Sequence, residues 1–428
     1  MISPEWTCPE FTPPSIGSLL RTPALPGARP PRDTILRMPS APAHVVNVPV
    51  NQIREITQAA WATPDSIVLS IGEPAFPVAR HVLEAAMAAL ERDDTNYTPN
   101  AGIAPLRAAF AERFAHLSGV DDDPSRVFVV AGAQQGLHLA LSTLIAAGDE
   151  VLIPDPGYPT FTMTVGLLGG VPVPYPLKPH HGFQPLIEDL RRLVTGRTKV
   201  LMLNSPSNPL GSVFDSDLTC ELVRFAHEND LWIISDECYE AFTYDVPHVS
   251  PARFDAGGPE AVPEAVEARV LTSLTLSKTY GLTGLRIGAL VTPPGMELLL
   301  SNVMEATVSC VSGPSQYAGI AALTGPQDYV RTALDHYRAN RDAATAVLDE
   351  RGISYLDARG AFYLWADLSH ATDGDVRAWT RTFLAEHGVA LAPGTAFGSM
   401  GEGWVRIALC GRRDELVEGL SRLPAPRA

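Results

Sequence analysis

Short apolar segments alternate with amphipathic segments through the middle of the chain, and this alternation constrains the fold more than any other feature. Strand-like runs of β-formers occupy residues 126–132, 150–156, 199–209, 231–240, 269–278 and 286–293. Helical periodicity follows three of them, at residues 133–148, 157–170 and 215–230. Strands without polar alternation, joined by helices, predict an α/β fold with a mostly parallel sheet. Because ligands bind at strand ends in such folds, we look there for polar clusters.

The chain has 428 residues, which is more than one hydrophobic core usually serves, so we expect a large and a small domain. The first forty residues are rich in proline and predict an extended arm. After about residue 300 the pattern is richer in helices, with one long helix at 327–352 that ends at Gly352. The predicted divisions are an arm (1–40), an N-terminal part of the small domain (41–75), a large domain (76–305) and a C-terminal small domain (306–428).

The formal net charge of −16 disfavours nucleic acid and anionic membranes as partners. The five cysteines are scattered and form no C-x-x-C pair, so we expect neither a disulfide scaffold nor a zinc ribbon. His180 and His181 are adjacent in a predicted loop, and we expect no metal site there. The N-terminus lacks the pattern of a signal peptide and no apolar run is long enough for a bilayer, so we expect a cytoplasmic protein.

The segment LTLSKTYGLTGLRIGAL (274–290) places Lys278 between hydroxyl residues at the end of a predicted strand. A lysine considered alone is usually a solvated surface group. A desolvated lysine, however, loses its proton easily and attacks carbonyls to form a Schiff base. If the carbonyl belongs to pyridoxal phosphate, the site also needs a phosphate cradle, an acid for the pyridine nitrogen, donors to the ring oxygen and a stacking surface.

Strand ends elsewhere in the chain offer a candidate for each need. Asp236 would pair with the ring nitrogen, and Tyr239 would donate to the ring oxygen. Asn208 follows another strand, and Tyr158 lies on a turn suited to stacking. The phosphate candidates are the backbone of Gly132, Ala133 and Gln134 with Thr275, Ser277 and Arg286. Each of these residues alone could be a cap, a turn or a packing residue, but their joint occurrence favours a cofactor site.

The motifs SLTLSKTYGLTGLRIG, NSPSNPLG, SDECYEAFTYD and YTPNAGIAPLR together resemble the fold-type I pyridoxal-phosphate enzymes of the class I/II, aspartate-aminotransferase-like family. The resemblance extends from about Arg37 to the C-terminus. It implies a large domain with a mostly parallel seven-stranded sheet, a smaller α+β domain and a homodimer. It also implies that Tyr97 reaches the cofactor phosphate of the neighbouring subunit.

The same resemblance assigns the cofactor roles given above to Lys278 and its companions. It further implies that Arg406, in GEGWVRIALC, clamps the substrate α-carboxylate, and that Gly72, in LSIGEPAFP, lets backbone approach it. Asn208 would contact the substrate as well. Two departures from the family pattern are Ala133, where many relatives have serine, and a longer loop at 245–268.

The implied reaction is transfer of an amino group between an α-amino acid and a 2-oxo acid, with Lys278 as general base and then acid. The same scaffold also hosts lyases, cyclases and other enzymes that act on amino acids without transamination, and the motifs leave this alternative open. A cofactor-sensing regulator would carry a basic DNA-binding module, and the proline-rich N-terminus is not strongly basic. The sequence does not select the amino acid.

Overall fold

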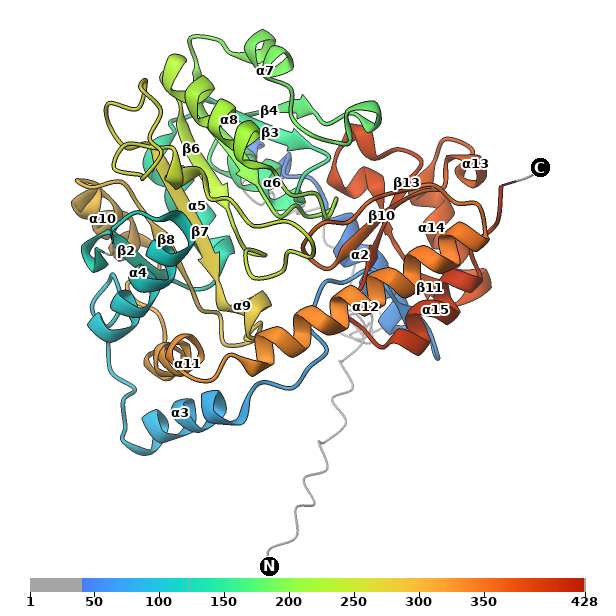
Figure 1. Cartoon of the computed structure of the whole chain (residues 1–428), viewed down its shortest axis with the longest axis horizontal. Coiled ribbons are helices and arrows are strands. Elements are labelled where there is room, and N and C mark those ends of the chain that lie inside the picture. The colour runs from blue at the N-terminus through green and yellow to red at the C-terminus, as the bar shows by residue number, and fades with distance from the viewer. Residues whose placement is uncertain (1–40, 122, 427–428) are drawn as a thin grey trace, which may run out of the picture. The chain divides into compact units, whose positions relative to one another are not determined.

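The computed structural model describes residues 41–121 and 123–426, so the predicted arm lies outside the described residues. Its largest sheet has seven strands in the order β2-β8-β7-β6-β5-β3-β4 (Figure 1). The strands are β2 (Val127–Val130), β3 (Glu150–Asp155), β4 (Val171–Pro176), β5 (Thr198–Asn204), β6 (Trp232–Asp236), β7 (Val270–Thr275) and β8 (Gly288–Val291). All neighbours pair in parallel except β8, which is antiparallel to both β2 and β7. This confirms the predicted fold class.

Helices cover both faces of this sheet because its strands are apolar on both sides. Val127 and Val129 of β2 contribute to the core on one face, and Phe128 and Val130 contribute to the core on the other. The first core also contains residues of α4 (Ala104–Ser118), α7 (Ile187–Leu193), α8 (Ser216–Glu228) and α11 (Gly313–Thr324). The second contains residues of α5 (Ala133–Leu144), α6 (Pro159–Leu167) and α10 (Glu297–Thr307).

A second, antiparallel sheet has the strand order β12-β13-β10-β9. Its strands are β9 (Tyr355–Leu356), β10 (Tyr363–Asp367), β12 (Ala392–Pro393) and β13 (Trp404–Ala408). The two-residue strands β1 (Ile67–Val68) and β11 (Val389–Ala390) pair in parallel nearby in the same core. The surrounding helices are α2 (Gln52–Trp61), α12 (Asp328–Glu350), α14 (Val376–His387) and α15 (Arg413–Ser421).

Helix α12 is the long helix that the sequence predicts, and it contacts α15 at one end of its course (Figure 1). Gly352, whose φ of +67° favours glycine, follows its last turn. Shorter or peripheral helices are α1 (Ala43–Val46), α3 (Arg80–Glu91), α9 (Leu276–Thr279) and α13 (Ser369–Thr372). Residues from Ala43 onward form one compact unit, and the domain divisions predicted within it stay predictions. No helix in the described ranges has both the length and the apolar character needed to cross a bilayer.

Candidate active site

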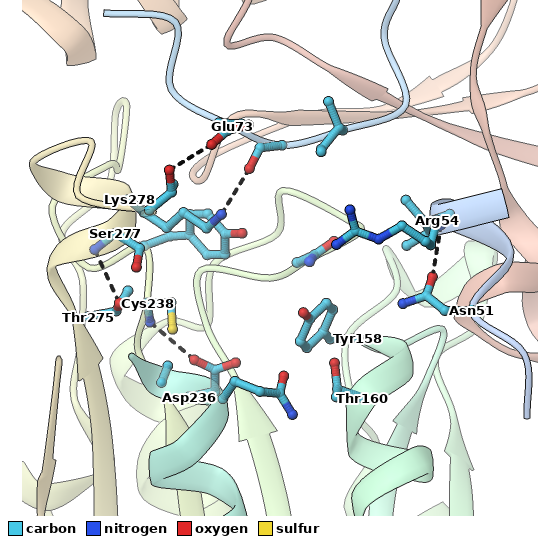
Figure 2. A pocket seen from close by; sticks show the side chains of 18 of the residues that line it. Asn51, Arg54, Glu73, Tyr158, Thr160, Asp236, Cys238, Thr275, Ser277 and Lys278 are labelled. Atoms are coloured by element: carbon cyan, nitrogen blue, oxygen red, sulfur yellow. Dashed lines mark hydrogen bonds between the residues drawn. The ribbon is translucent and has the colours of Figure 1, made fainter. Parts of the chain in front are cut away.

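A cavity of about 660 Å³ lies where β5, β6 and β7 end and where the antiparallel sheet faces them. Figure 2 shows side chains at the strand ends of the seven-stranded sheet and from the segment around α2 directed inward. Most of the residues that the sequence singles out line it: Gly72, Ala133, Gln134, Tyr158, Asn208, Asp236, Tyr239, Thr275, Ser277, Lys278, Arg286 and Arg406. Of the remaining two, Gly132 lies at the N-terminus of α5 next to the cavity, whereas Tyr97 does not line it.

Lys278 lies in α9, a single turn that begins directly after β7. The hydroxyl of Thr275 caps this turn by accepting from the backbone N–H of Ser277 at 3.2 Å. The Lys278 Nζ donates to the carbonyl oxygen of Gly72 at 2.9 Å, across a long sequence separation. Burial lowers the pKa of the Lys278 amine, because desolvation disfavours the ammonium form. The cavity therefore holds an amine that is readily deprotonated and aimed by a backbone carbonyl.

Asp236 ends β6 with a side chain that is almost fully buried. Its Oδ1 accepts a long hydrogen bond of 3.3 Å from the backbone N–H of Cys238. Burial raises the pKa of Asp236 to about 6, because the hydrogen bonds with Cys238 do not offset desolvation. A carboxylate in this position is suited to a cationic or strongly polarised N–H donor, such as a protonated pyridine nitrogen.

The N-terminus of α5 and its neighbours form a cradle suited to an anion. Gly132 is the N-cap of α5 with φ of +78°, and a Cβ there would lie 2.7 Å from Arg286 Nη2. Arg286 is held in place by a bond from Nη2 to the carbonyl oxygen of Ala131 at 3.0 Å. The buried hydroxyl of Ser277 has no hydrogen-bond partner among the described residues. Free helix N–H groups, a guanidinium and a hydroxyl that needs a partner fit a phosphate group.

Arg406 lies in β13 and is 2 % exposed. It donates to Asn208 Oδ1 at 2.8 Å and to the carbonyl oxygen of Ser70, while its Nε has no partner among the described residues. Its guanidinium stacks 4.3 Å from the ring centroid of Tyr363 and 4.9 Å from that of Phe397. A buried guanidinium that lines a cavity with a spare donor is suited to a carboxylate ligand.

The aminotransferase class I and II model matches residues 64–423 of this chain. The chain belongs to that family. It is 36 % identical to a probable aspartate/prephenate aminotransferase of Aquifex aeolicus over 84 % of this chain and 90 % of the relative. It is 33 % identical to aromatic-amino-acid aminotransferase 2 of Thermococcus litoralis, over 87 % and 94 % of the two chains. A solved aspartate aminotransferase of Thermus thermophilus, a double mutant, aligns with a TM-score of 0.83 at 32 % identity, covering 90 % and 99 %.

These matches confirm the predicted enzyme class, and aminotransferases of this family use pyridoxal phosphate. They also favour amino transfer over the lyase and cyclase alternative. The buried carboxylate of Asp236 and the partnerless hydroxyl of Ser277 show that the cavity fits this cofactor. The roles of the individual residues are taken up as proposals below.

Sequence reasoning missed Tyr363, which connects several groups of this aminotransferase. Its hydroxyl shares a 2.9 Å hydrogen bond with the hydroxyl of Tyr239. A Cβ at position 72 would lie 1.9 Å from that hydroxyl, so glycine is needed where Tyr363 fills the space. Tyr363 lies in β10, which pairs with β13, the strand that carries Arg406. The residue pattern did not indicate that its side chain points into the cavity.

Other cavity residues carry no strand-end signal. They include Asn51, Ile53, Arg54, Thr57 and Trp61 of the segment around α2, with Glu73, Thr160 and Met163. Figure 2 shows Arg54 extending from α2 across the opening, opposite Lys278. The adjacent histidines His180 and His181 lie in a 3₁₀ turn, and the described residues contain no cluster of metal-ligating groups.

Proposed function

We propose that the chain binds pyridoxal phosphate covalently through Lys278 and moves an amino group between an α-amino acid and a 2-oxo acid. The single observation that carries this proposal is the pairing of a desolvated amine with a buried carboxyl group in one cavity. When bound, the cofactor supplies an electron sink for the negative charge that develops at the substrate α-carbon.

Each protein group has a separate task in this proposal. Lys278 would act as the general base that removes the α-proton of the substrate and then, as the resulting ammonium, as the general acid that gives a proton back. Asp236 keeps the ring nitrogen protonated, while Tyr239 and Asn208 donate to the ring oxygen. The N-terminus of α5, Thr275, Ser277 and Arg286 hold the phosphate.

Three further residues shape the ring face and the substrate end. Tyr158, at the N-terminus of α6, covers the ring. Arg406 binds the α-carboxylate through its spare donor, and Gly72 leaves room for it beside Tyr363. Together they orient the α-carbon between Lys278 and the ring.

The proposal also includes a homodimer, in which Tyr97 of one subunit contacts the cofactor phosphate bound by the neighbouring subunit. Tyr97 is 92 % exposed and lies outside its own cavity, which a role in a second subunit would explain. Large apolar side chains are also exposed on α3 and α10, among them Met87, Leu90, Leu298 and Leu299. Sedimentation that detected only monomers of the active enzyme would contradict this part.

The Lys278→Ala variant tests the function directly. We expect wild-type holoenzyme to show a visible absorbance band and to become fixed to the cofactor at Lys278 on borohydride reduction. The variant should lose both the fixed adduct and turnover, by at least about 10³-fold. An adduct mapped by mass spectrometry to another lysine, or turnover retained in the variant, would refute the assignment.

A further inference from the structure

We propose that Asp155 is a positioning residue, which sets how far the arginine that binds the substrate carboxylate lies from the side chain that covers the cofactor ring. This inference rests on the proposed function, because it takes Arg406 to hold the α-carboxylate and Tyr158 to cover the ring. It goes further by giving a role to a buried acid that does not line the cavity.

Asp155 is the last residue of β3 and is only 5 % exposed. Its carboxylate forms no ion pair within the ranges that the structure describes, and a single distant segment supplies its hydrogen bonds. Ser399 Oγ donates to Oδ2 at 2.7 Å, and the backbone N–H groups of Ser399 and Met400 donate to Oδ2 at 3.1 Å and to Oδ1 at 3.0 Å. Because a buried carboxylate is costly without such donors, this contact holds the two segments together.

The segment that supplies these donors is shaped to lie directly against Asp155. It consists of two 3₁₀ turns, η4 (Gly394–Phe397) and η5 (Ser399–Gly401). Between them Gly398 has a φ of +135°, and a Cβ at this position would collide with Asp155 Oδ1. The approach of the two backbones is therefore too close for a side chain, and it depends on the carboxylate.

One end of this segment leads to Arg406. Turn η4 follows β12 directly, and Ala392 of β12 pairs with Arg406 of β13. The ring of Phe397, which is 4 % exposed, lies with its centroid 4.9 Å from the Arg406 guanidinium. The same ring packs edge-on against Trp365, with 5.7 Å between the centroids. A shift of the segment would therefore reach the guanidinium through the ring of Phe397.

The contact with β3 leads in the other direction to Tyr158. The backbone N–H of Gly157 donates to the carbonyl oxygen of Phe397 at 2.7 Å. A Cβ at position 157 would collide with the carbonyl oxygen of Pro154, so the turn between β3 and α6 is tight. Tyr158 is the N-cap residue of α6 and lines the cavity (Figure 2). Asp155 and Gly157 thus fasten the turn that carries Tyr158 to the segment of Phe397 at two points.

The distance that this junction sets matters only for a ligand that spans both ends of the cavity. In the proposed function a substrate places its amine at the ring and its carboxylate at Arg406. A misplacement of about 1 Å between such groups can cost about 100-fold in rate. Asn208 of the loop after β5 holds Arg406 from one side. Asp155 holds it from the side of Tyr158.

The experiment begins with Asp155→Asn, which is almost isosteric. The amide has one acceptor oxygen, and its NH₂ group would face a backbone N–H, so the junction is lost. Holoenzymes are mixed with L-alanine, L-aspartate, L-glutamate or L-phenylalanine in single turnover, and loss of the visible band is followed. We expect the second-order rate constant of every donor that wild type converts to fall by about 10–100-fold.

Two ligands that each engage one end separate positioning from general damage. n-Propylamine has no carboxylate and engages the ring end, whereas butyrate has no amine and engages Arg406. Their dissociation constants, read from the shift of the visible band, should change by less than about 2-fold in Asp155→Asn. Each end remains intact in this variant, and only the distance between the ends is released.

Variants of the exposed Ser399 test the same bond from its other side. Ser399→Ala removes one of three donors and should lower the rate constants by about 2–10-fold. Ser399→Thr keeps the hydroxyl and should stay within about 2-fold of wild type. In the Asp155→Asn background, Ser399→Ala should change nothing further, because the bond that it removes is already lost.

The matched control is Asp255→Asn. Asp255 is 3 % exposed, accepts from the backbone N–H groups of Arg269 and Val270, and pairs with His227, but it does not line the cavity. The same change of a buried acid to its amide should lower the unfolding temperature there too. It should leave every rate constant and dissociation constant unchanged.

The outcomes separate this inference from the proposed function. If wild type converts no donor, the proposed function fails and the positioning role with it. If donors convert but Asp155→Asn changes their rate constants by less than about 2-fold, or weakens butyrate or n-propylamine as strongly as it slows the amino acids, only the positioning role is overturned. Equal slowing in Asp255→Asn overturns it as well. If Asp155→Asn does not fold, Ser399→Ala carries the same comparison, and unchanged rate constants in that variant overturn the role.

Discussion

The two sheets of this aminotransferase contribute different kinds of groups to one cavity. The seven-stranded sheet supplies Asp236 and Lys278, held by backbone at the ends of strands, where burial shifts their protonation. The antiparallel sheet supplies Arg406 and Tyr363, held mainly by contacts between side chains. In the proposed function, the first sheet carries the groups of the reaction and the second carries groups that orient the substrate. Changes in the first should therefore reduce turnover, and changes in the second should alter substrate binding.

After Lys278→Ala, the largest effect is expected for Asp236→Asn. The amide cannot stabilise a protonated ring nitrogen, so kcat should fall by about 10²–10³-fold with every amino donor. Single-turnover kinetics with acidic and neutral donors would measure this loss. A loss confined to one class of donor would indicate that Asp236 acts in substrate recognition. That result would contradict the division of roles between the two sheets.

The same variant should stabilise the protein when the cofactor is removed. Raising the pKa of Asp236 from 3.8 to about 6 corresponds to a cost of about 3 kcal/mol for the cofactor-free fold. Because the folded-state pKa is the higher one, this cost is absent below pH 3.8, grows as pH rises towards 6 and is constant above. Thermal unfolding of cofactor-free wild type and Asp236→Asn should therefore diverge between these pH values. If the unfolding temperatures of the two cofactor-free proteins depended on pH in the same way, the raised pKa of a buried Asp236 would be refuted.

Arg406→Gln should have the next largest effect, and a different one. Loss of a buried, charge-assisted carboxylate contact should lower kcat/KM by about 100-fold, mainly through KM. Arg406→Lys should recover little of the lost kcat/KM. An ammonium group cannot bond Asn208 Oδ1 and at the same time form a bidentate contact with the substrate carboxylate. The visible band of the substrate-free holoenzyme should remain. Loss of the band in this variant would indicate that Arg406 helps to hold the cofactor rather than the substrate.

The smallest effect is expected for Tyr363→Phe. Burial raises the pKa of Tyr363 to about 12, so its hydroxyl stays protonated and is available to bond Tyr239. Removing it should change kcat/KM by about 2–10-fold and shift the pH at which the visible band titrates, because Tyr239 loses its partner. The control is Tyr337→Phe, which removes a buried hydroxyl without a described partner in the same aromatic cluster. Equal shifts in both variants would mean that only packing changed.

Much of the site could be predicted because strand ends leave a clear pattern. Asp236, Asn208 and Lys278 each follow an apolar run, and parallel strands bring their carboxyl ends to one edge of the sheet. The fold class followed from the same alternation. These residues were predictable because the chain positions them locally.

Arg54 and Tyr363 could not be predicted in the same way. Arg54 lies in an ordinary amphipathic helix, and only the packing of α2 beside β12 turns its face to the cavity. Tyr363 reaches Tyr239 across 124 residues, and the pairing of β10 with β13 leaves no trace in local composition. Strand β4, with alternating prolines, also lacks the apolar run that marked its neighbours. Long-range packing, rather than propensity, decides these positions.

The bond between Arg406 and Asn208 joins the residue proposed to bind the substrate carboxylate to the residue proposed to bind the ring oxygen. Because Asn208 Oδ1 is occupied by the guanidinium, the amide NH₂ of the same side chain is turned the other way, where the ring oxygen is expected. A carboxylate that draws Arg406 towards itself would loosen this hold on the amide. In the proposed function, substrate binding at Arg406 would thus alter the hydrogen bond that Asn208 donates to the ring oxygen.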